Sequence, residues 1–146
     1  MNDSLMSTYK RLPVAFTHGS GALLWDSGDR SYLDAVSGIA VCNLGHAHER
    51  VTEAICKQAA SLVHTSNLYG IPKQDALGDI LTDLAGMQRA FFCNSGAEAN
   101  EAAIKLARLH GKARGIKVPG IVVMENSFHG RTLATLSATG NRKVHA

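Results

Sequence analysis

Apolar residues recur at helical spacing in four segments of the chain, and in its second half these segments alternate with two short, continuous apolar runs. Spacing near i, i+3 and i+4 predicts amphipathic helices, whereas a run of about four apolar residues predicts a buried strand. The predicted helices are 48–63, 72–85, 97–113 and the start of one over 132–138, and the predicted strands are 90–93 and 121–124. The order strand, helix, strand, helix is typical of an α/β fold with a parallel sheet.

The first half of the chain follows a different pattern. Residues 4–11 predict a short helix that Pro13 ends, because the residue before a proline avoids helical backbone angles. Residues 14–34 form short apolar runs broken by glycine-containing turns, which is typical of a hairpin or meander. Residues 35–45 are small and apolar with two glycines, so strand and buried loop both stay open. Two parallel strands cannot close or cover a sheet, which indicates an unusual fold or a piece of a longer protein.

Composition narrows the function classes. With 45% hydrophobic and 18% charged residues among 146, the chain has the character of a folded, soluble domain. The net charge of +3 is spread without a run of like charges, so neither nucleic acid nor a membrane is an expected partner. Three cysteines without CxxC spacing favour neither disulfides nor zinc. Because no signal segment and no stretch of about 20 apolar residues is present, we expect a cytoplasmic protein.

The segment 91–101 carries the strongest chemical signal. An apolar run passes through a small polar turn directly into a predicted helix. Free backbone amides at a helix N-terminus, together with the positive end of the helix dipole, bind anions. Gly96 and Ala97 would allow a phosphate to approach the backbone closely, and the Ser95 hydroxyl can add a donor. The same residues also fit a capping box in which Ser95 and Glu98 satisfy each other's backbone donors, so both interpretations stay open.

A second polar loop, 126–131, follows the predicted strand 121–124. Ligands of open parallel sheets bind beyond the carboxyl ends of the strands, so this loop and the Ser95 turn could flank one crevice. There Phe128 could lie flat on an aromatic ring, and the planar guanidinium of Arg131 could bind a carboxylate. The alternatives are a core aromatic and a solvated surface charge.

Other candidate sites have weaker signals. No phosphate-loop motif occurs, and residues 19–24 miss the last glycine of the dinucleotide fingerprint. His46 and His48 have no third ligand at usable spacing, so no metal site is expected. Cys93 lies in a predicted buried strand, where cysteine behaves as a small hydrophobe. Glu98 and Glu101 are favoured near a helix N-terminus, and either could orient neighbouring loops.

Several of these motifs, in this order, carry a family resemblance. The segments 37–46, 92–101 and 128–132 resemble the class III pyridoxal-phosphate-dependent aminotransferases, most closely their acetylornithine branch. Further agreement comes from 9–13, 24–26 and 66–69, so the likeness covers nearly the whole chain. It implies a partial fold-type I architecture. Residues 1–70 would be the N-terminal segment of the small domain with a linker, and 71–146 the start of the large, cofactor-binding domain.

The resemblance also implies an activity and roles for particular residues. Family members of this branch use pyridoxal 5'-phosphate to move an amino group between N-acetylornithine and 2-oxoglutarate (giving glutamate) in arginine biosynthesis, commonly as homodimers. Gly96 and Ala97 match the positions whose backbone binds the cofactor phosphate, with Ser95 beside them. Phe128 matches the residue stacked on the pyridine ring, with His129 next to it. Arg131 matches the arginine that binds the substrate carboxylate.

In the family, the Schiff-base lysine comes later than the position where this sequence stops, and no lysine here stands in its motif. The resemblance therefore implies no catalytic residue within these 146 residues, and a chain that is inactive alone. The alternatives are another class III aminotransferase, acting on ornithine, succinylornithine or 4-aminobutyrate, or a non-catalytic fragment that acts only by association with a partner chain.

Overall fold

The computed structural model describes residues 4–145, which form two compact units. The first unit comprises residues 1–69 and the second residues 70–146, although residues 1–3 and 146 lie outside the described part. This division falls one residue before the boundary expected from the sequence. The assignment of the two units to a small and a large domain stays a prediction.

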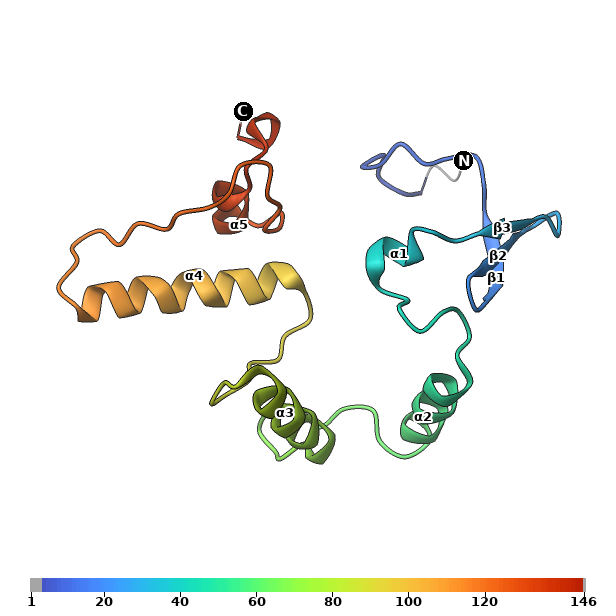
Figure 1. Cartoon of the computed structure of the whole chain (residues 1–146), viewed down its shortest axis with the longest axis horizontal. Coiled ribbons are helices and arrows are strands. Elements are labelled where there is room, and N and C mark those ends of the chain that lie inside the picture. The colour runs from blue at the N-terminus through green and yellow to red at the C-terminus, as the bar shows by residue number, and fades with distance from the viewer. Residues whose placement is uncertain (1–3, 146) are drawn as a thin grey trace. The chain divides into compact units, whose positions relative to one another are not determined.

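The first unit contains a three-stranded antiparallel meander, as the short apolar runs predicted (Figure 1). Strand β2 lies in the middle, with its backbone paired to both neighbours. The rings of His18 and Trp25 stack across the first pair, with centroids 4.9 Å apart. Gly21 takes a positive φ of 56° in the first turn, a conformation that glycine adopts without steric cost. The strands are β1 (Phe16–Ser20), β2 (Leu23–Asp26) and β3 (Ser31–Leu33).

Residues 35–45, left open between strand and loop, form neither a strand nor a regular helix. The short element α1 (Ser37–Ala40) consists of residues with left-handed backbone angles, including Ile39 at φ 66°. Such angles are unfavourable for a β-branched residue, so neighbouring contacts must hold the turn. Asp34 supplies several of them: its Oδ1 accepts hydrogen bonds from the amides of Val36 at 3.0 Å and Ser37 at 2.8 Å.

The other oxygen of Asp34 fixes the far end of this segment. Asp34 Oδ2 lies 2.6 Å from Nε2 of His46. A carboxylate only accepts hydrogen bonds, so Nε2 carries the proton. His46 is also paired through its backbone with Gly21, with N–O distances of 2.8 and 3.0 Å. His46, one of the two histidines considered as metal ligands in the sequence, thus serves as a partner of Asp34.

We expect this arrangement to loosen in acid. The hydrogen bond from His46, and after it the amide of Ser37, lowers the pKa of Asp34 below its ordinary value. Because the folded-state pKa is the lower one, the stabilisation is complete above the ordinary aspartate pKa of about 3.9 and is lost as the pH falls through the lowered value. Amide chemical shifts of Val36 and Ser37, followed by NMR during acid titration, measure this transition.

Asp34→Asn is the control for the acid titration. It keeps the size of the side chain and removes the titrating group, so the amide shifts of Val36 and Ser37 should no longer follow that transition. A midpoint at the ordinary aspartate pKa in the unchanged chain would contradict the predicted role of His46.

Two amphipathic helices follow the meander, as their spacing predicted: α2 (Glu49–Ala59) and α3 (Pro72–Ala85). Pro72 occupies the first turn of α3, where its missing amide is not needed, and Gly86 ends the helix in the left-handed conformation. The leucine and isoleucine side chains of α3 are largely exposed. Within residues 4–145, no helix has the length and apolar character needed to span a bilayer.

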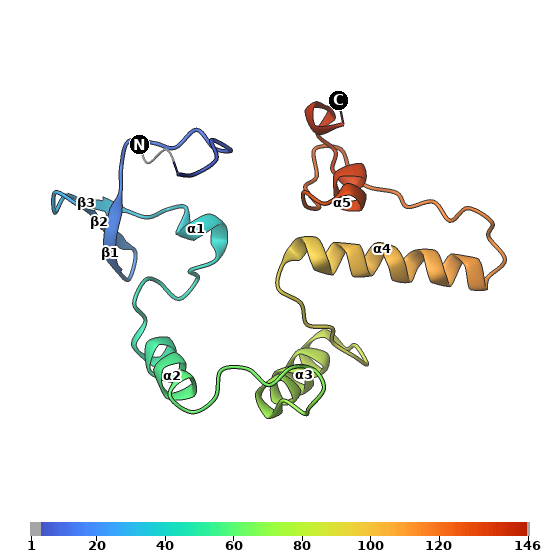
Figure 2. The same ribbon diagram turned by 180° about the vertical axis from the view of Figure 1, so that it is seen from behind.

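The second unit is organised around the long helix α4 (Gly96–Ala113). The chain reverses after it at Gly115, which has a φ of 79°, and returns alongside α4 to the short helix α5 (Leu133–Ala138) (Figures 1 and 2). Pro119 crosses so close to Gly111 that a Cβ on the glycine would lie 2.7 Å from the proline. The buried residues Thr135 and Ala138 lie on α5. A 3-10 turn, η1 (Arg142–Val144), follows.

Two strand predictions differ from the structure. Residues 90–93 and 121–124 have no ladder partner among the described residues, and a strand is defined by such pairing. The exposure of the side chains alternates along residues 121–124, which indicates an extended backbone. Ile121 and Val123 are 44% and 38% exposed, whereas Val122 and Met124 are 97% and 79% exposed. Cys93 was expected to be buried in the first of these strands, but its side chain is exposed.

The predicted helix over 4–11 is also wrong. These residues contain a turn and bends but no helical segment. An isolated helix of two turns is marginally stable in water, because the unfavourable free energy of helix nucleation exceeds the stabilisation from so few hydrogen bonds. Exposed Leu5, Met6 and Tyr9 show that packing does not supply the missing stabilisation.

Candidate functional site

The entrance of α4 is partly capped by its own side chains. Ser95 is the N-cap residue in extended backbone geometry, with φ −155° and ψ 158°, and its Oγ accepts a hydrogen bond from the Glu98 amide at 3.2 Å. The carboxylate of Glu98 in turn accepts the Asn94 amide at 2.6 Å. The capping-box interpretation is therefore correct for Ser95 and Glu98, with Asn94 in place of the N-cap amide.

The cap leaves donors at the same helix end. The amides of Gly96 and Ala97 have no acceptor among the described residues, and the Ser95 hydroxyl accepts a bond yet still carries a proton to donate. A Cβ built on Gly96 would meet no atom within 4 Å, so the space in front of its backbone is open. An anion can therefore bind here without disturbing the cap, helped by the dipole of an 18-residue helix.

The loop 126–131 lies against this end of α4. Gly130 takes a φ of 135° and packs so closely that a Cβ there would lie 2.8 Å from the Cβ of Ala97. The side-chain amide of Asn100 donates to the carbonyl of His129 at 2.7 Å. The hydroxyl of Thr132, just after the loop, donates to the carboxylate of Glu101. The loop that carries the predicted ring-binding residues thus adjoins the helix end that carries the free amides.

The exposure of the side chains in this loop indicates that they do not pack in a core. Phe128 is 70% exposed and Arg131 is exposed, so the interpretation of Phe128 as a core aromatic is wrong. His129 is half-buried, and its Nδ1 lies 3.4 Å from Ser127 Oγ. The backbone amide of His129 donates to Thr139 Oγ1 at 3.2 Å. The loop is therefore held by its backbone, while an aromatic face and a guanidinium remain at the surface.

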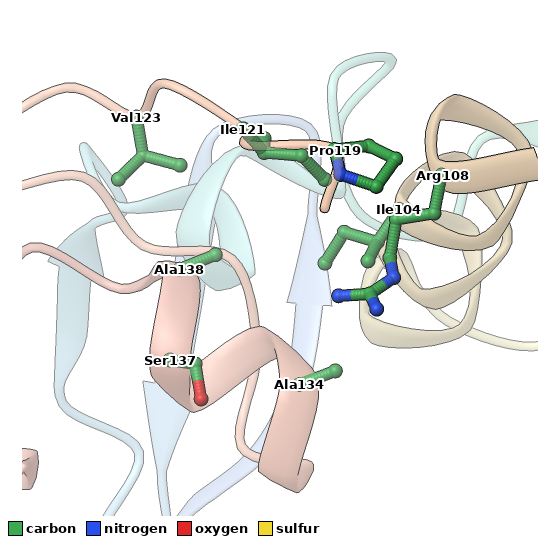
Figure 3. Close-up of a pocket in the computed structure, with 8 residues that line it drawn as sticks. All are labelled: Ile104, Arg108, Pro119, Ile121, Val123, Ala134, Ser137 and Ala138. Atoms are coloured by element: carbon green, nitrogen blue, oxygen red, sulfur yellow. The ribbon is translucent and has the colours of Figure 1, made fainter. Parts of the chain in front are cut away.

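A separate cavity of about 300 Å³ lies between α4, the returning segment and α5 (Figure 3). Apart from the Arg108 guanidinium and the Ser137 hydroxyl, its lining is apolar, and none of the predicted cofactor or substrate residues lines it. Ile121 and Val123 cover it with the less exposed face of the extended segment. The cavity therefore reflects packing behind that segment and is distinct from the helix entrance, where the predicted site residues lie.

Two residues of the site were not singled out from the sequence. Asn100 stands in the second turn of a helix otherwise rich in alanine, and asparagine is unfavourable there, which was an available signal. Gly130 has a backbone angle that disfavours other residues, but a single sequence does not distinguish it from an ordinary loop glycine. The sequence left open that Glu98 or Glu101 could orient a neighbouring loop. In the structure, Glu101 accepts a hydrogen bond from Thr132, just after the loop 126–131.

Together, the free amides, the exposed aromatic ring and the guanidinium fit a small ligand that combines a phosphate with a flat ring. The family model described as "Aminotransferase class-III" matches residues 5–146. The chain belongs to the class III aminotransferases, and the expected α/β, partial fold-type I architecture is confirmed.

Within the family, acetylornithine aminotransferases are among the similar relatives. That of Nitrosomonas europaea is 61% identical over 142 residues, which are 97% of this chain and 36% of that protein. That of Prochlorococcus marinus is 53% identical over 140 residues, 95% of this chain and 33% of that protein. The chain spans about a third of the length of these relatives.

Solved structures give the same picture. An N-acetylornithine aminotransferase from Stenotrophomonas maltophilia matches 85% of this chain and 35% of its own, with TM-score 0.77 and 39% identity. An ornithine aminotransferase from Toxoplasma gondii, described with partial occupancy of PLP at its active site, matches 98% of this chain and 34% of its own, with TM-score 0.87 and 28% identity. Class III aminotransferases depend on PLP, so the family supports the predicted cofactor.

Proposed function

We propose that this chain contributes the phosphate-binding and ring-binding part of an aminotransferase that moves an amino group between N-acetylornithine and 2-oxoglutarate, forming glutamate, with pyridoxal 5'-phosphate. The observation that carries the proposal is the pair of free amides at Gly96 and Ala97 beside the Phe128–Arg131 loop. The proposal extends to a cytoplasmic homodimer and to a place in arginine biosynthesis. The names of the acetylornithine relatives support the place in arginine biosynthesis alone.

The residues divide the work by their chemistry. The amides of Gly96 and Ala97 and the hydroxyl of Ser95 would hold the phosphate, and open space in front of Gly96 accommodates it. Phe128 would stack on the pyridine ring with His129 beside it, and Arg131 would bind the substrate carboxylate. Bound pyridoxal phosphate supplies the electron sink for the reaction. No lysine of this chain is assigned to the covalent link, and we infer that the chain alone does not transaminate.

Phe128→Leu should weaken pyridoxal phosphate binding selectively. Loss of an aromatic stack is worth about 0.5–1.5 kcal/mol, which corresponds to roughly 2- to 12-fold in affinity. The affinity for inorganic phosphate, which does not need the ring contact, should stay the same. Equilibrium dialysis with absorbance detection measures both.

Phe91→Leu is a matched control for the ring contact, because Phe91 has the same 70% exposure and lies before the helix entrance. An equal loss of pyridoxal phosphate affinity in the two variants would contradict the assignment of Phe128.

The choice of amino donor needs an activity comparison in the enzyme that carries this segment. Faster transamination of N-acetylornithine than of ornithine is the expected result. The opposite preference would favour the second candidate, an ornithine aminotransferase, which the Toxoplasma gondii structure supports through its TM-score of 0.87. The association hypothesis predicts no turnover with either donor.

A further inference from the structure

Two hydrogen bonds join the first turns of α4 to the loop that carries Phe128, over a sequence separation of about 30 residues. Asn100 Nδ2 lies 2.7 Å from the His129 carbonyl oxygen, and the Thr132 hydroxyl bonds to Glu101. These contacts flank the close approach of Gly130 to Ala97. We call Asn100, Glu101 and Thr132 the clasp. Figure 2 shows the loop and α4 side by side from behind.

The direction of each bond is fixed by chemistry. A carbonyl oxygen only accepts, so Asn100 must present its amide nitrogen to His129. Glu101 as a carboxylate only accepts, so the Thr132 hydroxyl donates its proton to it. The buried hydroxyl of Thr135, 2.8 Å from the Thr132 hydroxyl, can then donate to Thr132, while it accepts the Thr132 amide at 3.0 Å. Thr132 of the clasp is therefore also hydrogen-bonded to the buried Thr135 of α5.

The rest of the loop is held by a different set of contacts. The Gly140 amide donates to the Ser127 carbonyl at 2.9 Å, and the His129 amide donates to Thr139. These bonds join the loop to the chain that follows α5, and they do not fix its distance from the α4 entrance. The relative position of the free amides and the Phe128 ring therefore depends on the clasp together with the close contact of Gly130 with Ala97.

From this geometry we propose that Asn100, with Glu101 and Thr132, positions the ring-binding loop relative to the phosphate-binding helix end. This inference rests on the proposed function, because it presumes one ligand that reaches both parts. The clasp residues touch the loop and not the ligand, so they are positioning residues. Their removal should uncouple the ring contact from the phosphate contact and leave the helix entrance intact.

Asn100→Leu tests the proposal, because leucine has a branched side chain of similar size to asparagine but lacks the amide that donates the hydrogen bond. In the 146-residue chain, the affinity for pyridoxal phosphate should fall about tenfold, and the affinity for inorganic phosphate should change less than twofold. Thr132→Val should reduce pyridoxal phosphate affinity in the same direction, and Thr132→Ser, which keeps the hydroxyl, should restore it. Asn141→Leu, an exposed asparagine in the same unit, is the matched control and should alter neither affinity.

The outcomes are separable. Equal loss of phosphate and pyridoxal phosphate affinity in Asn100→Leu indicates general unfolding of the unit and overturns the positioning role. Unchanged pyridoxal phosphate affinity in Asn100→Leu also overturns it, as does failure of Thr132→Ser to restore binding. If the unchanged chain binds neither ligand, the proposed function itself is overturned.

Discussion

Gly96→Pro is expected to reduce phosphate and pyridoxal phosphate affinity by about 10- to 150-fold while α4 remains helical. The substitution removes one amide that would donate to a charged phosphate, a bond worth about 1.5–3 kcal/mol. Proline is well suited to this position, because Gly96 is the first residue of the helix. The extended angles of Ser95, φ −155° and ψ 158°, are those that a residue before proline favours. Isothermal titration measures both affinities.

The control for this result is Gly96→Ala, which keeps the amide and places a methyl group where no atom lies within 4 Å. A second control is Glu49→Pro, the same change at the first residue of α2 in the other unit. Circular dichroism should show unchanged helix content in all three variants. Should Gly96→Pro bind phosphate as tightly as Gly96→Ala, the amide has no role in anion binding and the helix entrance is only capped.

Gly130→Ala should detach the Phe128 loop from α4. A φ of 135° is unfavourable for alanine, at a cost of about 1–3 kcal/mol. The new Cβ would also lie 2.6 Å from Thr135 Oγ1 and 2.8 Å from Ala97 Cβ, and such overpacking costs about 1–3 kcal/mol more. We expect faster hydrogen exchange at the side-chain amide of Asn100, which donates to the His129 carbonyl, and at least a tenfold loss of pyridoxal phosphate affinity. NMR exchange rates and dialysis provide the two measurements.

Gly120→Ala is the matched control for Gly130→Ala, because a Cβ at residue 120 meets nothing within 4 Å and its φ lies outside the left-handed region. It should leave both measurements unchanged. Retention of slow exchange at the Asn100 side-chain amide in Gly130→Ala would show that the loop tolerates a side chain and that its contact with Ala97 is not required.

Helices were predictable from the sequence where an apolar stripe and a terminal signal agreed. Pro72 and Gly86 enclose α3, and Ser95 precedes α4, so local chemistry determines these boundaries. The strands at 90–93 and 121–124 were not predicted correctly, because an apolar run indicates burial and extension but does not supply a hydrogen-bonding neighbour. The left-handed turn at Ser37–Ala40 has no sequence signal of its own; it depends on contacts from Asp34.

Candidate site residues could be proposed from the sequence where a residue type has a specific chemical use, and their roles stay predictions. A serine before a helix that begins with glycine is compatible with an anion site, and an aromatic near an arginine is compatible with binding of a ring and a carboxylate. The structure adds how these pieces are joined: Asn100 reaches the His129 carbonyl, 29 residues away in sequence. A contact of that separation depends on how the chain returns along α4, which the pattern of apolar residues does not specify.

The extended segment Ile121–Met124 has a consequence for how the purified chain behaves at high concentration. Val122 and Met124 project outward beside backbone groups without a ladder partner, and this combination favours intermolecular β-pairing. Pro119 before it and Glu125 after it interrupt such growth, since one lacks an amide proton and the other adds charge. The five residues between Pro119 and Glu125 are fewer than the six or seven that typically build a fibril core, so aggregation should remain reversible on dilution.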